Sequence, residues 1–261
     1  MMSEVQWLRW LNLHVQRYES SENDLQVRGV MSESVINIEN ASIGFSVENP
    51  LIRDLNLKVN QGEIVAIAGP SGIGKTTLLR TIAGLVPMLE GEISLFGRNS
   101  KASRGKLGYI PQRLGLIRHA SVYHNVLMGA LTSTSDSWFP FSFEARRRTL
   151  ESIDAMGISE KKRTPIRLLS GGQQRRVATA RTLAQRPEII LADEFLGELD
   201  EETMESVLTK VTDYVHTNNA TLIVVEHDLA RAKRMADRLL ILDDGRLNPF
   251  VSKPMAVELT E

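Results

Sequence analysis

The segment from Gly69 to Thr77 carries the strongest chemical signal in the sequence. It matches the pattern G-x-x-x-x-G-K-[ST], and it lies between a continuous apolar run and a helix-compatible stretch. Glycines let the backbone turn so that successive N–H groups face an anion, and the positive end of the following helix adds a favourable field. Lys75 is expected to reach the β- and γ-phosphates of a nucleotide, and the Thr76 hydroxyl to bind Mg²⁺. The predicted binding residues are Gly69, Pro70, Ser71, Gly72, Ile73, Gly74, Lys75, Thr76 and Thr77.

Two carboxylates follow a second apolar run, residues 189–192. A phosphate-binding loop of this kind needs another strand that ends in a carboxylate to complete the metal site. Asp193 meets this requirement, because it emerges where the predicted strand ends. Glu194 comes directly after it and is well placed to polarise the attacking water, as a general base or a positioning group. Alone, this pair would be interpreted as a solvated strand end, but the loop at 69–77 favours the catalytic interpretation.

A second anion-binding turn is predicted more than ninety residues after the loop, at Leu169, Ser170, Gly171, Gly172 and Gln173. Two adjacent glycines precede a helix-compatible stretch, and the serine is a suitable cap for the free N–H groups at its start. One chain has no evident use for two such turns on one terminal phosphate. The second turn is therefore expected to face a neighbouring molecule.

The sequence L-S-G-G-Q followed by Q-R-R-V-A resembles the signature of ATP-binding cassette ATPases. The resemblance runs from about Val35 to Leu247. It implies that two copies of the chain pair head to tail and bind two ATP molecules with Mg²⁺. Each ATP would then lie between the 69–77 loop of one copy and the signature of the other.

Four further residues match motifs of that family one by one. Phe45 stands where an aromatic side chain, usually Tyr, stacks on adenine, and Phe keeps the face that stacking needs. Gln112 resembles the glutamine that senses Mg²⁺ and the attacking water. Asp200 resembles the residue that communicates across the dimer. His227 resembles the histidine that contacts the γ-phosphate and donates a hydrogen bond as charge develops.

The sequence departs from the family after the predicted base. Phe195 stands where the family usually has Pro, and Gly197-Glu198 replace the usual Ser-Ala. Both changes fall in the segment that links hydrolysis to the opposite subunit. They leave Asp193 and Glu194 in place, so ATP hydrolysis is still expected.

The elements that must position these residues follow from the apolar pattern. Alternating or continuous apolar runs predict strands near 35–43, 55–59, 64–68, 92–96, 188–192 and 221–225. A helix is predicted from Lys75 to about Leu85, and helical segments separate the later strands, which indicates an α/β fold with a mostly parallel sheet. The resemblance adds an N-terminal antiparallel β subdomain and an inserted α-helical subdomain at about 112–180 to this P-loop NTPase core.

The composition limits the possible functions. The 261 residues include no cysteine, which excludes disulfides and thiolate chemistry. The net charge of -1 does not favour electrostatic binding of nucleic acid by the chain as a whole. No apolar stretch approaches the roughly 20 residues that span a bilayer.

A cassette domain is expected at 35–261, after an extension at 1–34. That extension holds Trp7 and Trp10 and is expected to be disordered or upstream of a true start at Met31; the alternative is a short docking or membrane-surface helix.

Two hypotheses concern what ATP hydrolysis drives. The first is a nucleotide-binding subunit, peripheral on the cytoplasmic side of the membrane, that powers separate permease chains and works with a solute-binding protein. The second is a non-transport cassette acting in an enzyme or nucleic-acid-associated assembly. A single cassette without a coiled-coil insertion favours the first, with no direct contact to nucleic acid.

The run Ser121–Gly129 and the later Glu144–Arg148 resemble phosphonate-import ATPases. An aromatic cluster follows the first run: Trp138, Phe139, Phe141 and Phe143. It is either part of the resemblance to phosphonate-import ATPases or a set of side chains that only pack the helical subdomain.

Overall fold

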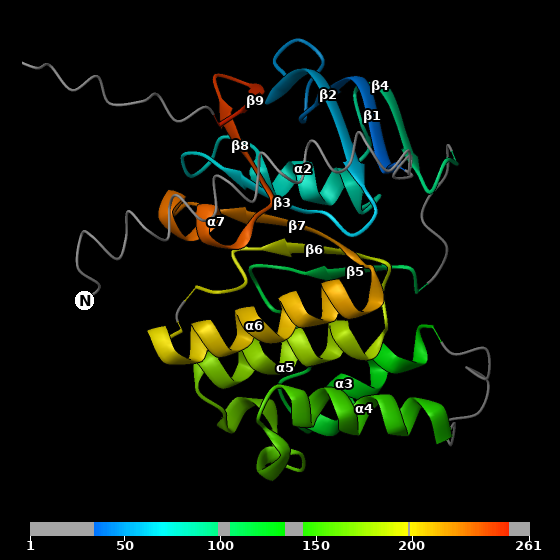
Figure 1. Ribbon diagram of the computed structural model, residues 1–261, viewed down its shortest axis with the longest axis vertical. Coiled ribbons are helices and arrows are strands. Elements are labelled where there is room, and N and C mark those ends of the chain that lie inside the picture. The colour runs from blue at the N-terminus through cyan, green and yellow to red at the C-terminus, as the bar shows by residue number, and fades with distance from the viewer. Residues whose placement is uncertain (1–33, 99–104, 134–142, 198, 251–261) are drawn as a thin grey trace, which may run out of the picture. The chain divides into compact units, whose positions relative to one another are not determined.

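The computed structural model describes residues 34–98, 105–133, 143–197 and 199–250. These residues form two β-sheets with helices around them. Figure 1 shows the smaller sheet at one end of the described region, the larger sheet in the middle and helices at the other end. The N-terminal extension, Trp138, Phe139, Phe141 and Glu198 lie outside the described residues.

The larger sheet is the core that positions the chemistry. Its strand order is β5-β6-β7-β3-β8-β9, and all neighbours are parallel except β8 and β9. Every residue of β3, β6 and β7 is buried, because other elements cover both faces of the sheet. The strands are β3 (Ile64–Ala68), β5 (Leu107–Ile110), β6 (Ile189–Asp193), β7 (Thr221–Glu226), β8 (Arg238–Asp243) and β9 (Arg246–Pro249).

The smaller sheet confirms the predicted antiparallel β subdomain. It has the order β2-β1-β4, with β1 (Ser34–Ile43) in the centre, β2 (Ile52–Asn60) on one side and β4 (Glu90–Leu95) on the other. Buried and exposed residues alternate along most of β2, as expected for a strand with one face on a core. The buried side chains of this sheet join those of α2 and of one face of β3 in a single apolar cluster.

Two of the predicted element ends were wrong for a local reason. Helix α2 (Lys75–Ile82) ends three residues before the predicted Leu85. Gly84 has a φ of 70° and donates its N–H to the Thr81 carbonyl, which turns the chain out of the helix. Similarly, β4 stops at Leu95 because Phe96 has a φ of 54°, outside the strand region.

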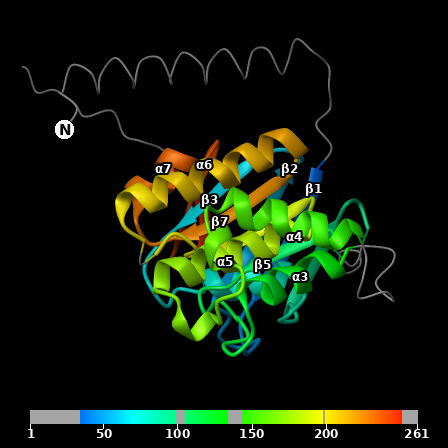
Figure 2. The same cartoon turned by 90° about the horizontal axis from the view of Figure 1, so that it is seen from below.

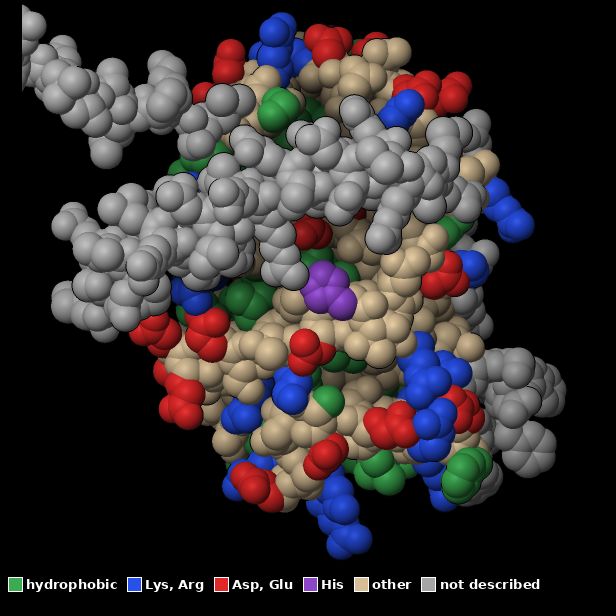
Figure 3. Space-filling model, viewed as in Figure 1, with side chains coloured by type: hydrophobic (Ala, Val, Ile, Leu, Met, Phe, Trp, Pro, Cys, Tyr) green, Lys and Arg blue, Asp and Glu red, His purple; other side chains and the backbone are tan. Residues whose placement is uncertain are grey.

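The second apolar cluster joins the other face of the large sheet to the helices. Figure 2 shows α3, α4 and α5 beside one another, and each of these helices packs on the other two. Acidic and basic side chains lie side by side over this helical part in Figure 3, as in the ion pairs of Arg147 with Glu144 and Glu151. The helices are α3 (Val122–Leu131), α4 (Phe143–Ala155), α5 (Gly171–Ala184), α6 (Glu201–Asn218) and α7 (Leu229–Met235), with short 3-10 turns at Ser159–Lys161 and Ile166–Leu168.

Candidate active site

The predicted phosphate-binding loop joins the buried strand β3 to helix α2. Gly74 is the N-cap of α2 and has a φ of 117°, which a residue with a side chain rarely adopts. At Gly69 an added Cβ atom would lie 2.4 Å from the carbonyl oxygen of Leu242. Glycine is therefore required at both ends of the turn, and the loop brings the N-terminus of a helix to the carboxyl edge of the sheet.

Lys75 is the buried cation of this loop. Its side chain is 4% exposed, and its Nζ donates hydrogen bonds to the carbonyl oxygens of Gly69 at 2.6 Å and Pro70 at 2.8 Å. Burial lowers the pKa of Lys75, while the nearby carboxylates Glu194 and Asp193 act in the opposite direction. The ammonium group is therefore held inside the turn, close to the two predicted catalytic acids.

Thr76 and Asp193 form the oxygen pair that the sequence predicts for a metal. The Thr76 hydroxyl donates to Asp193 Oδ1 at 3.0 Å, and the Tyr109 hydroxyl lies 3.4 Å from Asp193 Oδ2. Burial raises the pKa of Asp193, and the hydrogen bond from Thr76 acts against this shift. A hydroxyl oxygen and one carboxylate suit Mg²⁺, which commonly completes its octahedron with phosphate oxygens and water. Among the described residues, no three acidic or histidine side chains could hold a metal by themselves.

Glu194 is the point where three predicted catalytic residues meet. Gln112 Nε2 donates to Glu194 Oε2 at 2.8 Å, and His227 Nδ1 lies 3.9 Å from Glu194 Oε1. Glu194 itself has a φ of 48°, in the left-handed region that non-glycine residues rarely occupy. Gln112 follows the end of β5, and His227 follows the end of β7. The parallel sheet therefore brings residues 112, 194 and 227 together from distant parts of the chain.

The other predicted site residues lie on separate elements. Phe45 follows β1 and is 80% exposed, so its ring has a free face. Ser170 caps α5, accepting a hydrogen bond from the Gln173 N–H at 3.3 Å while Gln173 Oε1 accepts from the Ser170 N–H. Asp200 caps α6 through the Thr203 N–H, which lowers the pKa of Asp200.

Glu226 is a charged residue of the site that the sequence analysis missed. It ends β7 directly before His227 and is fully buried, although the sequence shows only an acidic residue at a strand end. Burial raises its pKa to about 7, and the ion pair with Arg231, at 3.6 Å, does not offset this effect. The other charged groups that act on it are Glu194, Asp228 and Arg175.

Together these features define a class of protein. A glycine-rich loop between a parallel strand and a helix, a buried lysine, and a threonine–aspartate pair beside a second acid are the parts of a P-loop nucleoside triphosphatase. They lie at the carboxyl ends of parallel strands, where ligands of open α/β sheets bind.

Comparisons with known proteins narrow this class. The family model described as ABC transporter matches residues 52–197. The chain is 38% identical over 228 residues to the phosphonates import ATP-binding protein PhnC of Trichormus variabilis, with 83% of this chain and 93% of that protein covered. It is 34% identical over 233 residues to the protein of the same name in Escherichia coli K12, with 82% and 88% covered. The chain therefore belongs to the ABC transporter family and is an ATP-hydrolysing cassette.

Two solved structures agree with this assignment. The dimeric post-hydrolysis state of the ATP-binding cassette MJ0796, bound to ADP and Pi, has a TM-score of 0.74 at 29% identity, covering 84% of this chain and all (100%) of that one. The cbiO1 protein of Clostridium perfringens has a TM-score of 0.71 at 25% identity, covering 82% and 87%. The predicted fold class and ATPase identity are thus confirmed. In the part of the chain that the structure describes, no helix has the length and apolar character of a membrane span.

The buried carboxyl of Glu226 leads to a prediction about stability and pH. Its pKa in the folded protein, about 7, lies above the ordinary value of 4.5. Its stabilising effect is therefore fully present below the ordinary value and is lost as the pH rises through about 7. For Glu226→Gln, the free energy of unfolding relative to wild type should rise by about 2–3 kcal/mol between pH 5 and pH 8. Urea unfolding at both pH values measures this difference, and equal values at pH 5 and 8 would contradict it.

Proposed function

We propose that this chain powers the import of a solute through separate permease subunits, as a dimer on the cytoplasmic side of a membrane. The observation that carries the catalytic part is the meeting of Lys75, Asp193 and Glu194 at the carboxyl edge of the sheet, with Gln112 2.8 Å from the Glu194 carboxylate. The names of the relatives support import, and those names favour a phosphonate-like solute. By the same kinship, a solute-binding protein would deliver the solute.

The first step is the binding of ATP by residues of one chain. The exposed ring of Phe45 stacks on adenine, and the backbone N–H groups of the 69–77 loop surround the phosphates. Lys75 places its charge between the β- and γ-phosphates. Thr76 and Asp193, with Gln112, would hold Mg²⁺, which neutralises phosphate charge when bound.

Hydrolysis then uses the group around Glu194. Water attacks the γ-phosphorus in line, an O–P bond forms, and the bond to the β-phosphate oxygen breaks to give ADP and phosphate. Glu194 orients the water and accepts its proton, and Gln112 keeps the carboxylate in place through the 2.8 Å hydrogen bond. His227 donates a hydrogen bond to the developing charge.

A second copy of the chain completes each site. The N-terminus of α5 is capped by Ser170, and the two residues that follow the cap are Gly171 and Gly172, whose backbone stands at the positive end of the helix. We assign Ser170 and Gly172 to the γ-phosphate of the partner's ATP, and Asp200 to communication between the two sites.

The helical part transmits the closing and opening of the dimer to the permease. Three apolar side chains of α3 and α4 are exposed on it: Met128, Phe143 and Leu150. Apolar side chains that face solvent are compatible with a contact to another protein. The region around 112–150 is therefore the proposed docking surface for the permease.

The role of Lys75 is tested by Lys75→Ala. The affinity for ATP should fall by about 10- to 100-fold, because charged hydrogen bonds to the phosphates are lost. Isothermal titration with ATP measures this change. Unchanged affinity would exclude the 69–77 loop as the phosphate site.

The role of Glu194 is tested by Glu194→Gln, which keeps the shape but removes the base. The hydrolysis rate should fall by about 10²–10⁴-fold, while ATP stays bound and the dimer accumulates. Phosphate release and size-exclusion chromatography with ATP report the two effects. Normal turnover by this variant would mean that another group acts as the base.

The shared site is tested by mixing two inactive proteins. Ser170→Arg blocks the signature, and Lys75→Ala disables the loop, so a mixed dimer contains one site in which both parts are wild type. The mixture should recover part of the hydrolysis that each protein lacks alone. A mixture no more active than its components would argue against a site built by two chains.

A further inference from the structure

We propose that Arg175 is a positioning residue for Glu194. It connects the catalytic carboxylate of each chain to α5 of the same chain, the helix that begins in the signature and is called the signature helix below. This inference rests on the proposed role of Glu194 and of the α5 N-terminus. It assigns a function to a side chain outside the residues that are proposed to bind ATP.

The contact is a buried hydrogen bond to the backbone of the base. Arg175 lies on α5 and is 7% exposed, and its Nη1 donates to the carbonyl oxygen of Glu194 at 3.0 Å. The same oxygen accepts from the Gly197 N–H at 3.2 Å, and the Glu194 N–H donates to Val225 at 3.0 Å. A charged donor in a buried position makes a stronger hydrogen bond than a neutral one. Arg175 is therefore a principal support of this peptide unit.

Glu194 needs such support because of its backbone. Its φ of 48° places it in a sparsely populated region, which persists only where surrounding contacts hold it. The side chain starts from this Cα atom, so a change of backbone there would turn the carboxylate away from Gln112 and His227. Fixing the carbonyl of Glu194 thus fixes the direction of its side chain.

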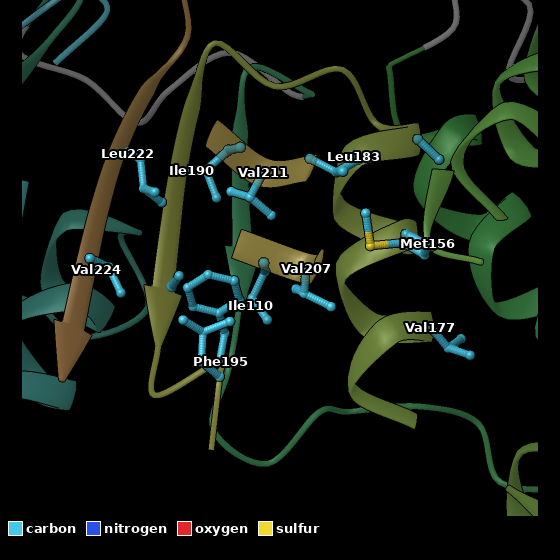
Figure 4. Packing of buried hydrophobic residues seen from close by; sticks show 14 of the residues in the cluster. Ile110, Met156, Val177, Leu183, Ile190, Phe195, Val207, Val211, Leu222 and Val224 are labelled. Carbon is cyan, nitrogen blue, oxygen red and sulfur yellow. The ribbon is translucent and has the colours of Figure 1, made fainter. Parts of the chain in front are cut away.

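The next residues anchor the same segment from the other side. Phe195 is fully buried, and Figure 4 shows its ring beside Ile110 in the apolar cluster. Gly197 lies next to the guanidinium, since a Cβ atom there would be 3.5 Å from Arg175 Nη2. Phe195 and Gly197, two of the residues that depart from the family pattern, therefore lie next to the carbonyl that Arg175 holds. Phe195 fixes one side by packing, and Arg175 fixes the other by a hydrogen bond.

Helix α5 connects this contact to the other nucleotide. Ser170 is its N-cap, and Arg175 follows within about one and a half turns. The end of α5 that closes on the partner's ATP therefore holds the base of its own site. A displacement of α5 when the partner's ATP is bound or released would move the carbonyl of Glu194.

The test compares Arg175→Met and Arg175→Lys with wild type. For Arg175→Met we expect kcat to fall by about 10- to 100-fold, the loss typical of a misplaced catalytic group, with ATP affinity unchanged and the ATP-bound dimer accumulating. Arg175→Lys keeps a charged donor on a long stem and should recover most of the rate. In the Glu194→Gln background, Arg175→Met should cause little further loss, because it acts through the missing base.

The matched control is Arg176→Met. Arg176 is the next residue of α5, and it donates to the carbonyls of Met156 and Gly157, away from Glu194. It should reduce kcat far less than Arg175→Met, because it leaves the hydrogen bond to the Glu194 carbonyl in place. If Arg175→Met does not fold, Arg175→Gln, which removes the charge but keeps a polar side chain, replaces it in both backgrounds.

The outcomes separate the two levels of the proposal. If Glu194→Gln hydrolyses ATP normally, the proposed function of Glu194 is wrong. If Glu194→Gln is slow but Arg175→Met, or Arg175→Gln in its place, keeps wild-type kcat, only the positioning role is wrong. Equal losses from the Arg175 substitution in the wild-type and Glu194→Gln backgrounds would also overturn it, because a general structural defect would act independently of the base.

Discussion

The site depends on a buried cation placed among carboxylates. Lys75 is the first residue of α2, directly after the turn that follows β3; burial lowers its pKa, and Glu194, Asp193 and Glu226 raise it. These acids come from the ends of β6 and β7, so the parallel order of the sheet is what gathers them around one ammonium group. A triphosphate adds negative charge to this balance, and the loop amides, Lys75 and a bound metal would offset part of it.

The parts of the fold that sequence could predict are those with a strong local pattern. Strands β3, β6 and β7 are continuous apolar runs, and the loop at 69–77 has a motif that requires its neighbours to be a strand and a helix. Strand β5 was not predicted, because it has four residues and includes Gly108, where a Cβ atom would lie 2.6 Å from Thr182. Strands β8 and β9 were also not predicted, although β8 contains the apolar run Leu239–Leu242, and they form a hairpin around Asp244 and Gly245.

The residues of the candidate site could be predicted from the sequence, but the contacts that hold those residues in place could not. Motifs place Thr76, Gln112, Asp193, Glu194 and His227 in one site, and the structure brings these side chains together. The contact of Arg175 with Glu194 joins residues that no motif relates, and the burial of Glu226 depends on how α7 covers β7. Packing of distant segments decides such contacts, so a single sequence does not contain a local signal for them. The substitutions at Phe195 and Gly197 were visible as departures, and only the fold shows what surrounds them.

We propose that two chains enclose each terminal phosphate. The most direct measurement is a crystal structure of the Glu194→Gln protein with ATP and Mg²⁺. We expect a dimer in which Ser170 and the Gly172 N–H of one chain contact the γ-phosphate that the other chain holds through Lys75. A γ-phosphate surrounded by the residues of a single chain, with both signature helices facing solvent, would contradict it.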